Sequence, residues 1–272
     1  MNTLILKKLI LKKMFCALLC TSLLCIATSS LAAPSLEFEV IAERSHKTSL
    51  FTQGLLVDGN QFYESSGLYG KSLLVSYPVA EPQGSTWAKI SAPFTRKTAL
   101  PPQYFAEGLT LLNNQLYLLT WKEQTLLVYD KTNFTLQQQF SYQGEGWGLT
   151  TDGKQLIRSD GSDRLFFHRA EDFSIARELH ITDDGKPVNQ LNELEYAQGF
   201  IWANVWYQDR VLKIDPANGK VLGELNLQAL KQSLALTNSE QVLNGIAWDE
   251  QQQGFWITGK LWPRLFLLRI AQ

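Results

Sequence analysis

The chain repeats one pattern of apolar and polar residues five times. Each copy has a short apolar run, a turn rich in Gly, Asn or Asp, and a second run in which apolar and polar residues alternate. This pattern predicts a β-hairpin. The five copies are QGLLVDGNQFYESSG from Gln53, EGLTLLNNQLYLLTW from Glu107, WGLTTDGKQLIRSDG from Trp147, NELEYAQGFIWANVW from Asn192 and NGIAWDEQQQGFWITGK from Asn244.

Further strands follow each hairpin. A third run reads SLLVSYP, TLLVYD, RLFFHR, RVLKID and RLFLLRI, and a fourth reads TLQQQFS, SIARELHI and KVLGELNL, with WAKIS (87–91) expected in the first copy. The copies begin 40 to 54 residues apart. Four strands at this period are typical of a β-propeller blade, so the chain is predicted to be an all-β, five-bladed β-propeller. A β-sandwich with as many strands would not explain a fivefold repeat.

The two ends of the repeat region complement each other. The fifth copy stops after its third strand, whereas LEFEVIAE (36–43) is a strand pattern without a hairpin of its own. We expect this N-terminal strand to pair with the last copy and close the ring, which removes exposed sheet edges. Residues 33–272 are therefore predicted to form one propeller domain. Helical spacing of apolar residues over 227–236 predicts a short helix between the fourth and fifth copies.

The first 32 residues have the layout of a secretory signal peptide. Four lysines precede an apolar stretch over 14–27, and Ser30-Leu31-Ala32 is an acceptable cleavage site before Ala33. All three cysteines lie in this segment, at positions 16, 20 and 25. The mature chain is therefore expected to be exported, periplasmic or secreted, and to use no disulfide, thiolate metal site or cysteine nucleophile.

Charge and histidine spacing exclude other classes. Residues 33–272 carry 21 basic and 26 acidic residues, a net charge of −5, without a basic stripe. Nucleic acid and an anionic membrane are therefore poor partners. Separately, a monomer is our working expectation, which the charge does not decide. The histidines His46, His168 and His180 have no neighbours at metal-ligand spacing, so a histidine-based zinc site is not expected.

Propeller geometry predicts which residues meet at one mouth of the channel. In each blade the first strand lines the channel and the second runs back, so the start of one and the end of the other lie together. The starts are Gln53, Glu107, Trp147, Asn192 and Asn244, and the ends are Ser65, Ser66, Trp121, Asp160, Trp206, Lys260 and Trp262. A concave site with aromatic walls and few polar groups is the default ligand site.

These residue types alone allow two interpretations. Trp121, Trp147 and Trp206 can pack between blades or line a pocket, and Lys260 can be a solvated cation beside an indole. Glu107 can be structural, or a proton-transfer group tuned by desolvation and a cation. Other residues have plainer expected roles: packing between blades for Trp202, Trp248 and Trp256, ties between blades for Glu193 and Glu195, and backbone contacts at strand entries for Asn192 and Asn244.

The phrases FTQGL, ESSGLYGKS, FAEGLT, LTW, GWGLTTDG, SDGS, LNELEY, IWANVW, LNGIAWD and ITGKLWP occur in that order. Over residues 36–270 the chain resembles the plant-type glutaminyl cyclases and their bacterial relatives. The resemblance implies a five-bladed propeller and a metal-independent glutaminyl-peptide cyclotransferase. It places the catalytic glutamate at Glu107 and the substrate pocket at Phe51, Gln53, Phe105, Trp121, Trp147, Asn192, Trp206 and Lys260. Some relatives carry a calcium ion in the channel, so a structural calcium is possible here.

The implied substrate is a peptide or protein with N-terminal glutamine. Its α-amine attacks its own side-chain carboxamide, releasing ammonia and leaving pyroglutamate. Glu107 is expected to shuttle the proton from the amine to the leaving ammonia. Lys260, Asn192 and Gln53 are expected to bind the carbonyl oxygen or fix the amide, while the aromatic side chains fold the substrate into its cyclising conformer.

Two other functions stay open at this point. A non-catalytic propeller could present the same mouth to a peptide or a partner protein. A metal-dependent, lactonase-like hydrolase would need several carboxylates around a central cation. The predicted mouth offers mainly Glu107 and Asp160 for that purpose.

Overall fold

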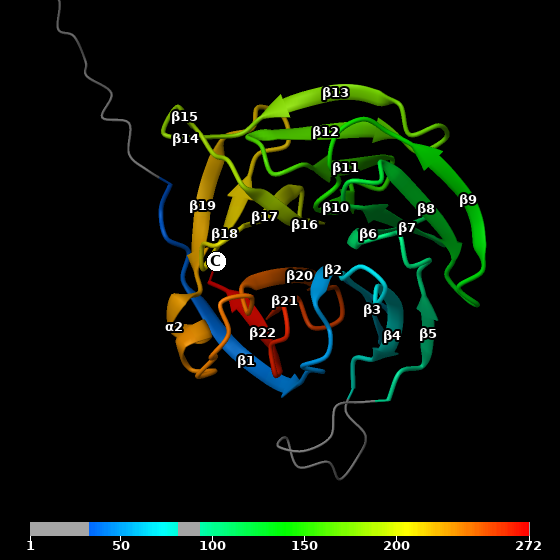
Figure 1. The fold of residues 1–272 in the computed structure, drawn as a ribbon. Coiled ribbons are helices and arrows are strands. Elements are labelled where there is room, and N and C mark those ends of the chain that lie inside the picture. The colour runs from blue at the N-terminus through cyan, green and yellow to red at the C-terminus, as the bar shows by residue number, and fades with distance from the viewer. Residues whose placement is uncertain (1–32, 81–92, 272) are drawn as a thin grey trace, which may run out of the picture. The chain divides into compact units, whose positions relative to one another are not determined.

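A computed structural model describes residues 33–80 and 93–271, and these form five four-stranded antiparallel sheets arranged around a central axis (Figure 1). The prediction of a five-bladed β-propeller is therefore confirmed. The strands of the first three sheets are, in order, β2 Thr52–Asp58, β3 Gln61–Ser66, β4 Leu73–Pro78 and β5 Arg96–Ala99; β6 Ala106–Leu112, β7 Gln115–Thr120, β8 Thr125–Asp130 and β9 Leu136–Ser141; β10 Leu149–Thr151, β11 Gln155–Ser159, β12 Arg164–Arg169 and β13 Ile175–His180.

The fourth sheet contains β16 Leu191–Ala197, β17 Phe200–Val205, β18 Arg210–Ile214 and β19 Val221–Asn226, and the fifth contains β20 Leu243–Asp249, β21 Gly254–Gly259 and β22 Arg264–Ile270. The outer position of the fifth sheet is taken by β1, Phe38–Ser45, which pairs with β22 in antiparallel register. A small hairpin, β14 Thr182–Asp183 and β15 Lys186–Pro187, joins the third and fourth sheets.

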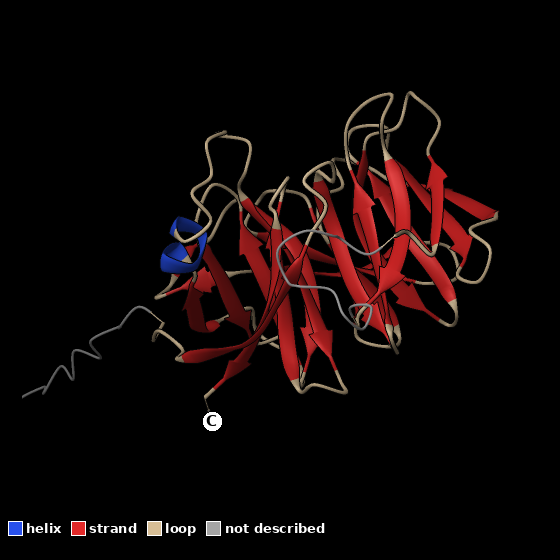
Figure 2. Cartoon of the chain, turned by 90° about the horizontal axis from the view of Figure 1, so that it is seen from below, coloured by secondary structure: helices blue, strands red, loops and turns tan. Residues whose placement is uncertain are grey.

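The structure differs from two local predictions. The fourth strand of the first sheet is β5, whereas the WAKIS segment (87–91) lies outside the described residues. The expected helix is shorter than its apolar spacing indicated, with α2 covering Gln228–Gln232 (Figure 2). No helix in the described ranges is long and apolar enough to cross a membrane.

The core lies between neighbouring sheets. Five apolar clusters fill the five junctions; the one between the third and fourth sheets joins Phe167 to Leu194 and Leu212. Trp202 and Trp256 are buried in such clusters, and Trp248 packs against one, as predicted. Because each sheet buries both faces, the apolar runs of the inner strands are nearly continuous.

The inner strands approach each other very closely around the channel. A Cβ atom on Gly54 of β2 would lie 2.4 Å from the backbone nitrogen of Leu109 in β6. Likewise, a Cβ on Gly148 would lie 2.0 Å from the carbonyl oxygen of Asn192. Only glycine fits where two backbones come this close. The Gly-Leu or Gly-Ile step that follows the strand start in four of the five copies therefore reflects the crowding at the axis.

The fourth sheet departs from this pattern because Glu193 occupies the glycine position. Its side chain is fully buried, and its Oε1 accepts a hydrogen bond from the Leu55 N–H (3.2 Å). Its Oε2 accepts from the Ile246 N–H (2.9 Å) and from Asn204 Nδ2 (3.2 Å). Glu195 Oε1 accepts from the Trp248 N–H (3.1 Å). The prediction that these two acids tie blades together is confirmed.

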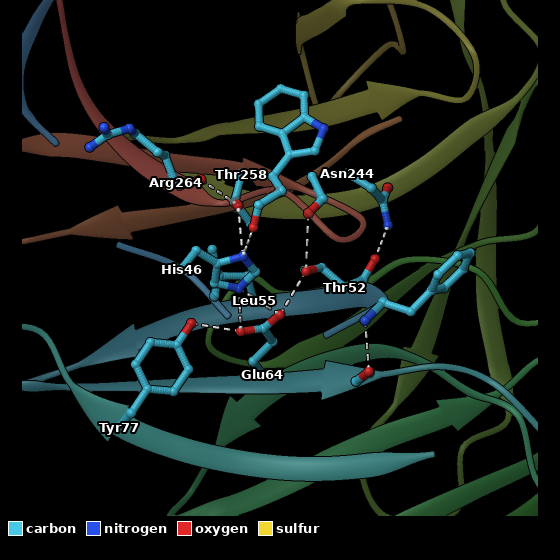
Figure 3. Close-up of polar contacts among 12 residues, drawn as sticks. His46, Thr52, Leu55, Glu64, Tyr77, Asn244, Thr258 and Arg264 are labelled. Atoms are coloured by element: carbon cyan, nitrogen blue, oxygen red, sulfur yellow. Dashed lines mark hydrogen bonds and ion pairs between the residues drawn. The ribbon is translucent and has the colours of Figure 1, made fainter. Parts of the chain in front are cut away.

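A second buried network joins the first and fifth blades (Figure 3). Glu64 of β3 accepts hydrogen bonds from the hydroxyls of Thr52 and Tyr77, each at 2.6 Å. His46, which follows β1, contacts Glu64 through Nε2 (3.1 Å) and the carbonyl oxygen of Trp262 through Nδ1 (2.8 Å). These contacts fix the start of β2 immediately beside the channel mouth.

We predict that Glu193→Ala markedly destabilises the fold, because it leaves the N–H groups of Leu55 and Ile246 buried without acceptors. An orphaned buried donor costs about 1–3 kcal/mol. One kcal/mol corresponds to a fall of about 2–4 °C in Tm for a domain of this size. Thermal unfolding of Glu193→Ala beside Glu171→Ala, a change at an exposed turn, tests this. Equal melting temperatures for both variants would contradict the role of Glu193.

Candidate active site

All nine predicted site residues line one pocket at the mouth of the channel. The pocket has a volume of about 250 Å³, and six of its thirteen lining residues are aromatic. This volume is below the roughly 300–1,000 Å³ of sites for drug-sized ligands, so it suits a group about as large as one side chain. Its lining is Phe51, Gln53, Leu68, Phe105, Glu107, Trp121, Trp147, Asn192, Trp206, Tyr207, Glu240, Val242 and Lys260.

An irregularity at the start of four inner strands presents the polar residues to the pocket. In β6, Ala106 pairs with Thr120 and the next pair is Leu109 with Leu118, so Glu107 and Gly108 lie outside the regular ladder. The same shift releases Gln53 in β2, Asn192 in β16 and Asn244 in β20. Bulges of this kind re-aim side chains and are common beside functional sites.

Glu107 lies almost completely buried in the pocket wall, with 5% of its surface exposed. Gln53 Nε2 donates a hydrogen bond to Glu107 Oε1 (3.1 Å), and Asn244 Nδ2 donates to Gln53 Oε1 (3.2 Å). Asn244 therefore fixes which end of the Gln53 amide faces Glu107. Asn244 itself does not line the pocket but also donates to the carbonyl oxygen of Thr52 (3.0 Å), as the backbone-contact interpretation predicted.

Burial raises the pKa of Glu107 well above its ordinary value, while Lys260 opposes this rise and Glu145 and Glu123 add to it. Burial lowers the pKa of Lys260, and the charge of Glu107 opposes that change. Lys260 Nζ lies 4.8 Å from the centre of the Phe51 ring. Burial therefore favours the uncharged forms of both Glu107 and Lys260. Shifted acids and bases of this kind are common where protons are exchanged.

Asn192 has an unused hydrogen-bonding group in this pocket. Its side chain is 3% exposed, and its Oδ1 has no hydrogen-bond partner in the described part of the chain. Its backbone carbonyl oxygen accepts a hydrogen bond from Ser159 Oγ (2.7 Å), which fixes the strand start. A buried polar group without a partner is costly, so this amide is suited to a bound ligand.

Some residues expected at the mouth lie elsewhere. Trp262 is fully buried in the core between the fourth and fifth sheets, where its indole N–H donates to the Gln241 carbonyl oxygen (3.1 Å). Asp160 closes a turn by accepting from the Ser162 N–H (3.0 Å) and does not line the pocket. Ser66 Oγ accepts from the Phe51 N–H (2.9 Å), so it supports the wall without lining it.

Four lining residues were missed by the sequence argument: Leu68, Tyr207, Glu240 and Val242. They lie in the connections next to strand ends, which a rule based on strand starts and ends does not reach. Tyr207 directly follows Trp206, and Leu68 closely follows Ser66, so extending the strand ends by two residues would have found both.

No group of three or more His, Cys, Asp or Glu side chains placed to hold a metal occurs within the described ranges, and a channel calcium stays a prediction.

A propeller whose channel ends in a small aromatic pocket, with a buried acid and a buried lysine in its lining, has the features of an enzyme active site. Comparisons with known proteins agree on one family. A family model described as glutamine cyclotransferase matches residues 14–270. A glutaminyl-peptide cyclotransferase of Arabidopsis thaliana is 38% identical over 240 residues, which cover 87% of this chain and 72% of the relative.

A solved structure supports the same assignment. The crystal structure of Myxococcus xanthus glutaminyl cyclase matches with a TM-score of 0.79 and 36% identity, covering 88% of this chain and 100% of that chain. The chain belongs to the glutamine cyclotransferase family. The predicted resemblance to glutaminyl cyclases is confirmed.

The raised pKa of Glu107 predicts a pH-dependent effect on stability. The folded protein holds this proton to a higher pH than the unfolded chain does. The resulting stabilisation is present below the unfolded value and is lost as the pH rises through the folded value. Glutamine keeps the shape of this side chain and does not ionise. The Tm of Glu107→Gln relative to the parent should therefore increase as the pH rises above about 4, the ordinary range of a glutamate carboxyl.

Thermal unfolding across this pH range measures the effect. Glu171→Gln, an uncharged replacement at an exposed turn, is the matched control and should show a nearly constant difference. A Glu107→Gln difference that stays flat or decreases with pH would show that the carboxyl is not held protonated by the fold.

Proposed function

We propose that this protein is a glutaminyl-peptide cyclotransferase, which converts the N-terminal glutamine of peptides or proteins to pyroglutamate and releases ammonia. The observation that carries the proposal is Glu107, a buried carboxyl inside an aromatic pocket large enough for one side chain. Membership of the glutamine cyclotransferase family supports the same reaction.

The proposed reaction begins with the glutamine side chain folded back toward its own α-amine. The aromatic lining favours this compact conformer, which supplies the proximity that ring closure needs. The amine nitrogen forms a bond to the carboxamide carbon, and the carbonyl oxygen gains negative charge. In this proposal Lys260 and the amides of Gln53 and Asn192 stabilise that charge in a site with little water.

Glu107 moves the proton in this scheme. An N-terminal amine has a pKa of about 7.7–8.0 and must lose a proton to act as a nucleophile. Ionised Glu107 accepts a proton from the attacking nitrogen and returns it to the carboxamide nitrogen, after which the carbon–nitrogen bond breaks and ammonia leaves. A carboxyl whose pKa is raised well above its ordinary value suits both steps.

Mass spectrometry of a peptide with N-terminal glutamine tests the proposal. After incubation with the protein, the peptide should lose the mass of one ammonia molecule. The same peptide with an acetylated α-amine is the control, because a blocked amine cannot attack. An unchanged glutaminyl peptide would instead favour a non-catalytic propeller. Turnover that a chelator abolishes and a metal restores would favour metal-dependent chemistry.

We predict that Glu107→Gln reduces kcat by about 10²–10⁴-fold, because it removes general acid–base assistance and leaves the shape of the pocket intact. KM should change far less. Lys260→Ala should give an intermediate loss, since it removes a stabilising charge but not the proton shuttle.

Glu171→Gln is a suitable control for these kinetics. Glu123 would be a poor one: it lies in the turn after β7, but it accepts hydrogen bonds from the Tyr69 hydroxyl (2.7 Å) and the Phe105 N–H (3.4 Å) at the pocket rim. A Glu107→Gln enzyme with the parental kcat would show that another group moves the proton.

We also propose that the mature protein begins near Ala33, is exported and acts as a monomer without nucleic acid or membrane partners. The basic and apolar pattern of residues 1–32, which lie outside the described residues, supports export. N-terminal sequencing of protein from the periplasm or medium tests this, and Met1 retained in a cytoplasmic pool would contradict it.

A further inference from the structure

The aromatic lining of the pocket consists of two arcs of rings in contact. In the first, Phe105 meets Phe51 (6.4 Å between ring centres) and Trp121 (5.6 Å). In the second, Trp206 meets Trp147 (5.3 Å) and Tyr207 (4.4 Å). No ring contact joins Trp121 to Trp147 among the residues that the structure describes. Something other than ring packing must hold the two arcs at a fixed separation.

One carboxylate oxygen bridges this gap. Glu145 Oε2 accepts hydrogen bonds from the indole N–H of Trp121 (2.8 Å) and from the indole N–H of Trp147 (2.9 Å). Each indole has a single polar hydrogen, so one bond to a fixed acceptor determines the orientation of the whole ring. Hydrogen bonds to an ionised acceptor are also about twice as strong as neutral ones. Glu145 therefore fixes the orientation of both indole rings.

The backbone around Glu145 is itself held firmly. The buried Arg158 of β11 donates through Nη1 to the Glu145 carbonyl oxygen. The Gly146 N–H donates to the carbonyl oxygen of Trp121 (2.9 Å), and a Cβ on Gly146 would lie 2.1 Å from the Tyr142 hydroxyl. Hydrogen bonds to the second and third blades thus hold the connection from β9 to β10 in place, and the Glu145 carboxylate is a fixed acceptor.

We propose that Glu145 is a positioning residue of the reaction, which holds Trp121 and Trp147 as one continuous wall against the substrate side chain. The proposal rests on the proposed cyclotransferase function. Glu145 acts through the two indoles and does not itself line the pocket. Its charge has a second effect, because it contributes to the raised pKa of Glu107.

Two substitutions separate position from charge. Glu145→Leu removes the acceptor and frees both indoles, and a misplacement of about 1 Å in a reacting group typically costs about 10²-fold in rate. We expect a loss of that order in kcat/KM, mostly in kcat. Glu145→Gln keeps an acceptor oxygen and removes the charge, so most of kcat should be retained.

The pH profile provides a readout that a merely structural role would not move. The charged groups that act on Glu107 are Lys260, Glu145 and Glu123. Removing the negative charge of Glu145 lowers the pKa of Glu107, so its ionised form persists to lower pH. The acid limb of kcat/KM should move to lower pH in Glu145→Gln, and Glu171→Gln should leave it in place.

Indole N–H resonances of protein labelled with ¹⁵N-tryptophan test the bridge without any turnover. Two of the eight indole signals, assigned with Trp121→Phe and Trp147→Phe, should shift together in Glu145→Leu. Unmoved signals, or parental kcat/KM in Glu145→Leu, would overturn the proposal. If the leucine variant does not fold, Trp121 and Trp147 signals that stay unmoved in Glu145→Gln overturn it, because a neutral acceptor holds the indole hydrogens more weakly than a carboxylate does. A parent protein without turnover would refute the proposed function instead, and the resonances would still decide whether the bridge exists.

Discussion

The close approach of the five inner strands around the channel is the constraint on which the site depends. Two backbones meet where Gly54 faces Leu109 and where Gly148 faces Asn192, and a Cβ there would overlap a neighbouring backbone atom. The ladder pairing breaks at the same level in four of the five blades. Three of these breaks present Gln53, Glu107 and Asn192 to the pocket, and the fourth places Asn244 behind Gln53, to which it donates a hydrogen bond. Crowding at the axis thus creates the positions that the chemistry uses.

Two buried glutamates at this level show how environment separates structure from function. Burial raises the pKa of both Glu107 and Glu193, but backbone hydrogen bonds from two other blades oppose the rise at Glu193. Those bonds satisfy both carboxylate oxygens of Glu193 and tie the ring together. Glu107 receives one amide hydrogen bond from Gln53 and faces a pocket. A buried carboxyl with few fixed partners destabilises the fold but can exchange a proton.

The repeated pattern predicted the fold and seven of the nine residues expected in the pocket, whereas Phe51 and Phe105 were expected only from the resemblance to glutaminyl cyclases. Strand starts and strand ends recur in each copy, and a propeller brings equivalent positions together. The pattern could not distinguish Trp262 from Trp206, because both follow the second strand of a blade. The tight turn after Gly259 directs Trp262 into the core, where its N–H reaches Gln241.

Residues outside the repeated strands were harder to predict. Leu68, Glu240 and Val242 line the pocket from connections between strands. Glu145 is close to Trp147 in sequence, but its bond to Trp121 depends on a contact between two blades. The sequence spacing gives no sign that the indole hydrogens of Trp121 and Trp147 share one oxygen of Glu145.

The central claim is that crowding at the axis buries Glu107 in a form that can exchange a proton near neutral pH. Direct titration of its side-chain carboxyl by ¹³C NMR, with Glu107→Gln to assign the signal, tests this most directly. The account predicts a midpoint well above the ordinary glutamate value of about 4.3, coinciding with the acid limb of kcat/KM for a glutaminyl peptide. A carboxyl that titrates near the ordinary value, with an acid limb set elsewhere, would contradict it.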